Sequence, residues 1–262
     1  MRASPRGPGA REKWTPMRYL IVSDVHSNKP ALDAVLSFVR RKRWDKLVCL
    51  GDLVGYGANP NQIVDTIRGL KPSVSIRGNH DKVCCGIEDG ELFNRIALEA
   101  AMWTRRKLTP ANQRWLTRLP RGPLEVDGEF AIAHGTPVDE DAYIFGEIEA
   151  LNVFRLTPYT LCFFGHSHFP VVFALSPDSI TTLLTRGQTF RLKLEKGVRY
   201  LINPGSVGQP RDGCPKASFA IFDTEAHSVT IHRIAYPLAT AQTRIRRAGL
   251  PRALADRLSL GR

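Results

Sequence analysis

Short apolar segments that alternate with helix-like segments open the chain, and this order constrains its fold more than any other feature. Residues 18–24, 46–52 and 73–79 are apolar runs that end in polar residues, as buried strands do. The segments between them begin near Pro30 and Pro60, and their apolar residues recur three and four positions apart, the spacing of one helix face. This order predicts an α/β fold whose first strands are parallel, with right-handed crossovers.

The middle and the end of the chain change character twice. Residues 88–119 hold no strand candidate and predict two helices, one over 91–108 and one opening at Pro110. Two apolar strands follow, over 129–135 and 160–168. Beyond them the chain is a series of short apolar strands separated by turn residues, a pattern typical of antiparallel hairpins.

The candidate functional residues are spread along the alternating region, so no domain boundary divides it. We therefore predict one domain over 17–236, in which the helical insertion 88–119 lies near the functional site. A basic extension rich in Pro and Gly, predicted to be disordered, forms residues 1–16. A basic tail with a helical pattern forms residues 237–262.

The positive charge of the chain gathers at its two ends. The net charge is +12, of which residues 1–18 carry +4 and residues 233–262 carry +6. RNA, DNA or anionic lipid would suit such ends, but solvated tails are the simpler interpretation, and the central region does not indicate a nucleic-acid partner. No apolar run approaches the about 20 residues of a membrane span, so no membrane partner is expected.

The cysteines indicate a reducing compartment. The chain has five, an odd number, and Cys49 and Cys162 lie inside apolar strands, where a thiol acts as a small hydrophobic side chain. No Cys-x-x-Cys pair is present, so a cysteine metal site is not expected. We expect a cytoplasmic location, since the first residues also lack the apolar core of a secretory signal.

Asp, Asn and His residues stand at the ends of five apolar strands. They are Asp24-Val25-His26, Gly51-Asp52, Gly78-Asn79-His80-Asp81, His134-Gly135 and Gly165-His166-Ser167-His168. Because sites in open α/β sheets form beyond the carboxyl ends of the strands, these side chains should converge. A single buried histidine or Gly-Asn-His-Asp turn more often has a structural role. A structural role does not explain five such motifs, each of which follows a strand.

The spacing within the motifs suits metal binding. Residues two apart in a chain that leaves a strand point to the same side, so Asp24 with His26, and His166 with His168, can reach one small volume. Carboxylates, imidazoles and the amide oxygen of Asn79 form a ligand set without sulfur, which suits manganese, iron, nickel or zinc. The sequence therefore predicts a site for divalent metal ions.

The motifs, in this order, resemble those of the calcineurin-like metallophosphoesterase superfamily, D-x-H, GD, GNH[DE], a single H and GHxH. Within the superfamily the chain resembles the compact bacterial and archaeal phosphodiesterases, which share SDVHSN, GDLVGYG, RGNHD, GHSH and NPGSVGQPRDG. The resemblance extends over roughly residues 17–235. It implies a four-layer αββα sandwich, in which two mixed β-sheets are flanked by helices, and a phosphoester hydrolase with two divalent metal ions.

The resemblance also implies a role for each motif residue. The first ion would be bound by Asp24, His26 and His168, and the second by Asn79, His134 and His166. Asp52 would bridge the two ions. His80 would be the general acid, with Asp81 orienting its imidazole, while a hydroxide that bridges the ions attacks phosphorus in line with the leaving group.

Two further residues are candidates for binding the substrate phosphate. Asn28 could contact it, and capping the helix that opens at Pro30 is an equal alternative. Arg211 could neutralise a phosphate oxygen, and its alternatives are an ion pair with Asp212 or a solvated side chain.

The predicted function is that of a phosphodiesterase acting on a small or nucleotide-like phosphoester. One alternative is a phosphomonoesterase or protein phosphatase. The other is a metal-binding scaffold of the same fold without catalysis, which predicts missing ligands, whereas every motif residue is present here.

Overall fold

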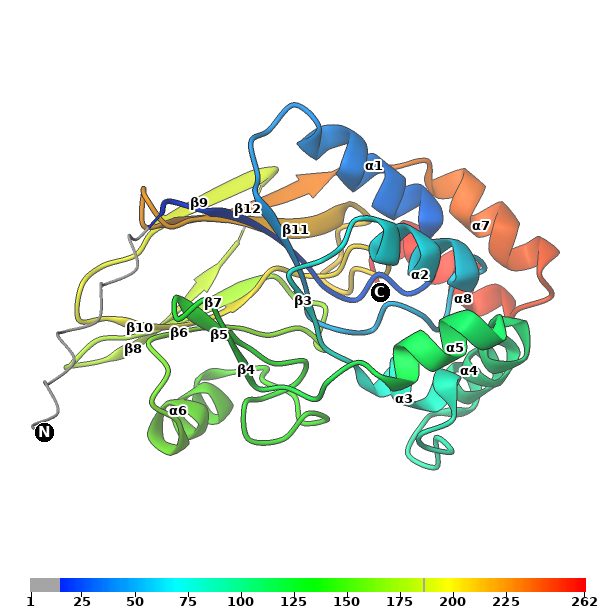
Figure 1. Cartoon of the computed structure of the whole chain (residues 1–262), viewed down its shortest axis with the longest axis horizontal. Helices are drawn as coiled ribbons and strands as arrows, with labels where there is room; N and C mark the ends of the chain where they lie inside the picture. Colours follow the sequence, from blue (N-terminus) through cyan, green and yellow to red (C-terminus); the bar gives the residue numbers. More distant parts are fainter. Residues whose placement is uncertain (1–14, 186) are drawn as a thin grey trace, which may run out of the picture.

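Successive side chains of strand β1 (Arg18–Val22) point into two different cores, and this alternation explains the layers of the fold. Leu20 and Val22 pack against helices, whereas Tyr19 and Ile21 pack against the second sheet. The computed structural model describes residues 15–185 and 187–262, and it has two six-stranded sheets between layers of helices (Figure 1). The predicted αββα sandwich of two mixed sheets is confirmed.

The first sheet has the strand order β3-β2-β1-β11-β12-β9. Its other strands are β2 (Lys46–Cys49), β3 (Val74–Ser75), β9 (Thr189–Lys193), β11 (Ala217–Asp223) and β12 (Ser228–Ile234). β1, β2 and β3 pair in parallel, as the alternation of strands and helices predicts. β11 runs antiparallel to β1 and continues into antiparallel pairs with β12 and then β9.

The second sheet has the strand order β4-β5-β6-β10-β7-β8. Its strands are β4 (Leu124–Val126), β5 (Phe130–Ile132), β6 (Leu161–Phe163), β7 (Val171–Leu175), β8 (Ile180–Leu184) and β10 (Arg199–Asn203). β5, β6 and β10 are parallel, and the rest pair antiparallel. The sequence does not predict the edge strands β4 and β8, because one has three residues and the other has no fully buried side chain.

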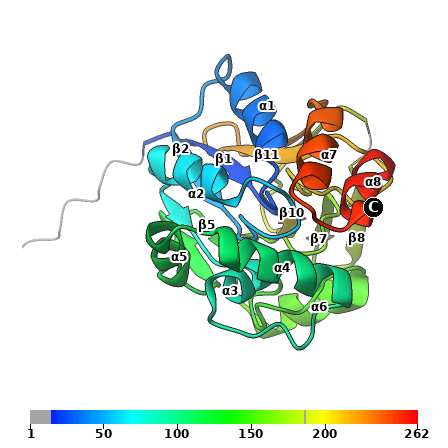
Figure 2. The same cartoon turned by 90° about the vertical axis from the view of Figure 1, so that its right-hand side faces the viewer.

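Helices cover the outer face of each sheet. Helices α1 (Lys29–Val39), α2 (Pro60–Gly69) and α7 (Leu238–Arg247) lie over the first sheet, where α1 contacts β11 and α7. Helix α6 (Glu147–Leu156) packs on β7 and β8 of the second sheet. Figure 2 shows one end of the sandwich, with α7 above and α4 (Arg95–Lys107) below.

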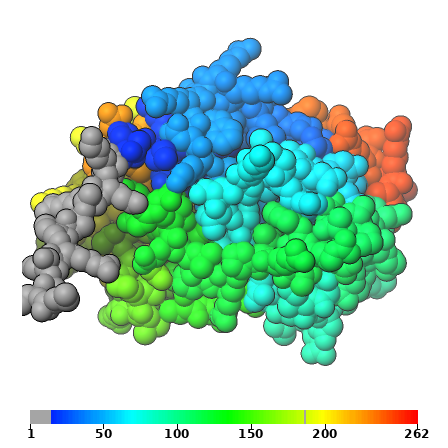
Figure 3. All heavy atoms as spheres, viewed as in Figure 1, coloured from blue at the N-terminus to red at the C-terminus, as the bar shows by residue number. Residues whose placement is uncertain are grey.

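The remaining helices are α3 (Asn79–Cys85), α5 (Pro110–Thr117) and α8 (Arg252–Leu260). α3 packs against both α4 and α5, and α8 packs against α7. In the space-filling view, the α2 segment in cyan adjoins the α4–α5 segment in green on one face (Figure 3). These contacts fix α3, the helix that carries the Gly-Asn-His-Asp motif, between the sheet and the insertion.

The helix boundaries differ from the prediction at three places. α4 begins at Arg95 rather than at residue 91, because the side chain of Asn94 caps it by accepting a hydrogen bond from the Ala97 amide at 3.0 Å. The tail is two helices rather than one, because Gly249 has a φ of 72° and Pro251 follows it. α3 is not predicted, since its polar first turn hides the helical pattern.

The predicted disordered extension lies, apart from residues 15 and 16, outside the described residues. Within the described ranges, no helix combines the length and apolar character that crossing a membrane requires.

Candidate metal centre

The loops that follow β1, β2, β3, β5 and β6 meet at one end of the sandwich and bring the motif residues together. One group of side chains whose ligand atoms lie within 4.8 Å of one another is Asp24, His26, Asp52 and His168. A second group that meets the same limit is Asp52, His134 and His166. Asp52 is therefore common to both groups.

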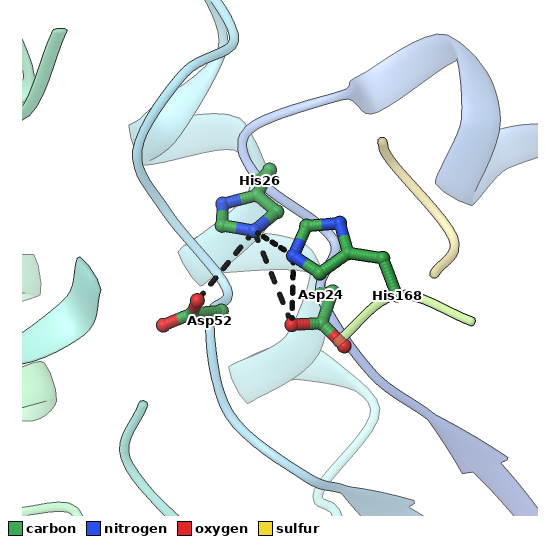
Figure 4. Close-up of side chains that lie close together, drawn as sticks. All are labelled: Asp24, His26, Asp52 and His168. Carbon is green, nitrogen blue, oxygen red and sulfur yellow. Dashed lines mark hydrogen bonds and ion pairs between the residues drawn. The ribbon is translucent and has the colours of Figure 1, made fainter. Parts of the chain in front are cut away.

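The first group is drawn in Figure 4. The Nε2 atoms of His26 and His168 are 3.2 Å apart, and Asp24 Oδ1 lies 3.3 Å from His168 Nε2. The carboxylate of Asp52 approaches from the other side, with its Oδ2 atom 3.5 Å from His26 Nε2. All four side chains are at most 1% exposed. They point toward one small volume, as the D-x-H spacing of Asp24 and His26 predicts.

The second group extends from the other side of Asp52. The Oδ2 atom of this carboxylate is also 3.5 Å from His134 Nε2. The amide oxygen of Asn79 lies 3.2 Å from the same imidazole nitrogen. The rings of His134 and His166 are 4.9 Å apart between centroids. The structure thus brings all seven predicted ligands to one place.

Hydrogen bonds to the backbone fix which ring nitrogen of each histidine faces the centre. The Nδ1 atoms of His26, His134 and His168 lie 3.1, 2.9 and 2.6 Å from backbone carbonyls, to which they can only donate. Their Nε2 atoms therefore point inward, the arrangement typical of metal-binding histidines. His166 has the opposite arrangement, because its Nε2 donates to the Asp141 carbonyl at 3.0 Å.

The centre holds buried acceptor atoms that no donor satisfies. Both carboxylate oxygens of Asp24 and the Oδ2 atom of Asp52 are buried without a hydrogen-bond partner in the structure. Two imidazole lone pairs face each other beside them. An unpaired buried acceptor is costly, and a cation is the group that would satisfy all of these atoms together. This donor set fits divalent metal ions, and it does so with oxygen and nitrogen ligands only.

The pKa values of the centre show how strongly its charges interact. Burial, together with the charge of Asp52, raises the pKa of Asp24 to about 7. Burial alone would lower the pKa of His134, but the charges of Asp52 and Asp24 outweigh it and raise that pKa to about 10. Burial drives the pKa of His26 and His168 well below the usual value, so both are neutral. A proton on His134 thus balances part of the buried negative charge that metal ions would balance.

The backbone at the centre is held in an unfavourable conformation. Five predicted ligands have φ between 46° and 65°, namely Asp24, His26, Asp52, His166 and His168. A residue other than glycine in this left-handed region costs of order 1 kcal/mol, and such residues cluster at functional sites. The tertiary structure therefore holds these loops in place at some cost in stability.

His80 lies beside the first group. Its ring centroid is 4.9 Å from that of His26 and 4.3 Å from that of Tyr56, and its Nδ1 atom is buried without a partner. Burial, against the opposing charge of Asp52, lowers the pKa of His80 to about 4. The imidazole is therefore neutral at pH 7 in this structure.

Asp81 does not pair with the His80 imidazole, in contrast to the prediction. Its Oδ1 atom accepts from the Val54 amide at 3.1 Å, and its Oδ2 atom accepts from the Gly78 amide at 3.1 Å. The reason is its position in the first turn of α3, where a carboxylate can reach back to the free amide that precedes the helix. Asp81 thus holds the turn that carries Asn79 and His80.

The two candidates for phosphate binding differ in the structure. Asn28 is the N-cap of α1: its Oδ1 accepts from the Ala31 amide at 3.2 Å, and its Nδ2 donates to the Gly208 carbonyl at 2.8 Å. It is 5% exposed, so the capping alternative is the one that its contacts support. Arg211 does not pair with Asp212, because that carboxylate binds Arg233 instead.

Three residues beside the centre are not among the residues predicted from the sequence. Tyr143 stacks on His166, with ring centroids 3.8 Å apart. Tyr56 packs on His26 at 4.7 Å, and the guanidinium groups of Arg211 and Arg257 lie 5.9 and 5.8 Å from its ring. Tyr56 falls within GDLVGYG, which gives a weak signal, whereas Arg257 is distant in sequence and only the folded tail brings it here.

A cleft of about 470 Å³ opens from the centre to the surface. From the centre it is lined by Asn79, His80, Tyr143 and His166. Its other wall is the segment 88–94, which precedes α4. A ligand in this cleft would contact the centre on one side and the beginning of the helical segment on the other.

Known proteins resemble this chain over nearly its whole length. A family model described as the calcineurin-like phosphoesterase superfamily domain matches residues 17–227. An uncharacterized protein of Methanocaldococcus jannaschii is 39% identical over 246 residues, which are 92% of this chain and 97% of that protein. The crystal structure of a metallophosphoesterase from Sphaerobacter thermophilus is 41% identical, with a TM-score of 0.82 over 95% of this chain and 100% of that chain. A hypothetical protein from Pyrococcus horikoshii has the same fold, with a TM-score of 0.74, 21% identity and coverage of 94% of this chain and 98% of its own.

Proposed function

Since this chain belongs to the calcineurin-like phosphoesterase superfamily, we propose that it is a phosphodiesterase that uses two divalent metal ions to hydrolyse a small or nucleotide-like phosphoester. The observation that carries the proposal is the pair of buried ligand groups that share Asp52. Family membership supports a hydrolase acting on phosphoesters, and the ligand groups supply the site at which such an ester would react.

The ligands divide between two ions. Asp24, His26 and His168 would hold one, and Asn79, His134 and His166 the other, with Asp52 between them. Manganese, iron, nickel or zinc suits this set of oxygen and nitrogen ligands. When bound, such ions clamp the phosphate oxygens and acidify water for attack on phosphorus.

His80 and Arg211 would act on the substrate rather than on the metal ions. The neutral His80 lies beside the first ligand group, and an anionic phosphate next to it would favour its protonated form. His80 can then give a proton to the departing oxygen. Burial and then the charge of Arg211 lower the pKa of His168, which supports a position of this guanidinium near the volume where the phosphate would bind. Asp81 contributes by holding the turn that positions His80.

The cleft supports a diester over a protein substrate. Its volume of about 470 Å³ accommodates a small molecule with groups on both sides of one phosphorus. Phe145 is 65% exposed and stacks on Tyr143 at 4.9 Å, and its other face offers a flat surface to an aromatic substituent. We also infer a reducing, cytoplasmic setting, since all five cysteines are free and four of them are buried.

The proposal is tested by removing metals and restoring them one at a time. The metal-free protein is supplied with manganese, iron, nickel, zinc or magnesium, and rates are compared for bis(4-nitrophenyl) phosphate and 4-nitrophenyl phosphate. We expect at least one of the first four metals to restore turnover, with the higher kcat/KM on the diester. A higher kcat/KM on the monoester would favour a phosphomonoesterase, and no turnover with any metal would refute the catalytic function.

A further inference from the structure

The C-terminal helix brings an additional positive charge to the metal centre. α8 is held against the loop that contains Arg211 by a hydrogen bond from the Gly213 amide to the Gly261 carbonyl at 2.9 Å. Arg257, on this helix, thereby lies 5.8 Å from the ring of Tyr56. The sequence suggests a solvated basic tail, but this arginine is half-buried beside the site.

Arg211 and Arg257 both approach the ring of Tyr56, with their guanidinium groups 5.9 and 5.8 Å from its centroid. Among the described residues, no Asp or Glu side-chain oxygen lies within 4.0 Å of either guanidinium. Arg211 donates to the Gln209 side chain at 3.1 Å, and its Nε atom is buried without a partner. Arg257 donates from Nε to the main-chain oxygen of Arg262. Both guanidinium groups therefore keep donors for a ligand.

Two cations held side by side repel each other unless an anion lies between or beside them. Burial, and then the charge of Arg211, lower the pKa of Arg257, which reflects this repulsion. A phosphodiester carries a single negative charge, and metal ions at the centre would already bind it. Such a substrate offers no second anionic group to the two arginines, whereas a substrate with another phosphate does.

A groove beside the cleft leads to Arg257. It is lined by Tyr56, Asn94, Arg95 and Arg257, and it has a volume of about 480 Å³. Tyr56 and Asn94 also line the cleft at the metal centre, so the two spaces adjoin. A substrate that reaches from the centre past Tyr56 would meet Arg257 and then the exposed Arg95.

We propose that Arg257, together with Arg211, forms a binding subsite for a second phosphate group of the substrate. The preferred substrates then carry one phosphate at the metal centre and another beside Tyr56. The position of the first phosphate rests on the proposed function, whereas the second site rests on the two arginines and the groove.

Two nucleotides that differ by one phosphate test this subsite by binding alone. Calorimetry on the full chain, loaded with manganese, compares thymidine 3′,5′-bisphosphate with thymidine 5′-monophosphate. Charge-assisted hydrogen bonds predict that the wild type binds the bisphosphate at least about 10-fold more tightly. Arg257→Gln should bring the ratio of the two affinities close to one. Its affinity for the monophosphate should fall no more than about twofold. Arg257→Lys keeps the charge and should retain part of the preference.

Arg252→Gln provides the matched control, because it removes one exposed arginine from the same helix and should leave the ratio unchanged. A melting temperature and a manganese content equal to those of the wild type would show that Arg257→Gln is folded and loaded. Equal affinities of the wild type for the two nucleotides would overturn the proposal. An equal loss of affinity for both nucleotides in Arg257→Gln would overturn it as well.

The same samples, assayed with bis(4-nitrophenyl) phosphate, separate this proposal from the proposed function. Turnover of the diester without a preference for the bisphosphate would refute the subsite and support the phosphodiesterase function. A preference that depends on Arg257, without turnover, would retain the subsite and remove the catalytic function.

Discussion

A methyl group at position 78 would collide with the carboxylate that both candidate metal groups share. A Cβ atom built on Gly78 would lie 2.1 Å from Asp52 Oδ1 and 2.6 Å from the Asp52 amide nitrogen. Neither neighbour is the free end of a flexible side chain, since Asp52 is 1% exposed and its Oδ1 atom accepts from the His80 amide at 2.9 Å. Gly78→Ala must therefore displace Asp52 or the start of α3.

The magnitude follows from these contacts. Overpacking a buried site costs about 1–3 kcal/mol, and loss of a hydrogen bond to a buried carboxylate costs about 1.5–3 kcal/mol more. We expect Gly78→Ala to lower the free energy of unfolding of the metal-free protein by about 3–6 kcal/mol. Because Asp52 belongs to both ligand groups, the variant should also lose metal from both positions.

Urea unfolding and metal content by mass spectrometry measure the two effects. Gly69→Ala is the matched control, because nothing lies within 4 Å of a Cβ atom at that position near the end of α2. It should be neutral or slightly stabilising and should keep its metal. A Gly78→Ala protein with the stability and metal content of Gly69→Ala would refute the placement of Asp52 against this turn.

Three further predictions concern side chains around the centre and in the first sheet. His80→Ala should lower turnover of alkyl phosphodiesters about 100-fold or more at unchanged metal content, and loss of metal would identify His80 as a ligand instead. Lys82 is 1% exposed, and its ammonium lies 2.7 Å from Asp141, whose side chain is 43% exposed, and 3.4 Å from Glu140. Lys82→Met should cost about 1.5–3 kcal/mol in urea unfolding through the loss of these charged hydrogen bonds, and a loss below about 1 kcal/mol would contradict them. Burial lowers the pKa of His232 to about 4, so the unfolded chain takes up a proton at this residue first as the pH falls below about 6.5. The loss of stability between pH 7 and pH 5 should therefore be about 1–2 kcal/mol larger in the wild type than in His232→Leu, and equal losses would contradict this reasoning.

The sequence predicts the layers and the metal ligands because both depend on local patterns. The alternating direction of the side chains along β1, together with the apolar face of α1, determines which side chains face each core. The ligands directly follow strands that lie side by side, so their convergence follows from strand order alone. What a motif residue contacts is a different question, because Asp81 binds the Val54 backbone and not the adjacent imidazole.

The features that the sequence does not predict depend on contacts between distant segments. Arg257 and Tyr56 are far apart in sequence, and they come together only because α7 and α8 fold back over the first sheet. The break at Gly249 that separates these two helices decides where Arg257 points. Asn28 shows both cases, since a local capping pattern before Pro30 accounts for its bond from the Ala31 amide but not for its bond to the distant Gly208 carbonyl.

Counting the metal ions and their dependence on Asp52 tests the central claim most directly. Metal-free protein is titrated with manganese by calorimetry, alongside His168→Ala and Asp52→Ala variants whose folding is checked by circular dichroism. The two ligand groups predict two ions per chain in the wild type, one in His168→Ala and none bound tightly in Asp52→Ala. A single ion in the wild type, or two retained in Asp52→Ala, would contradict a two-metal centre bridged by this carboxylate.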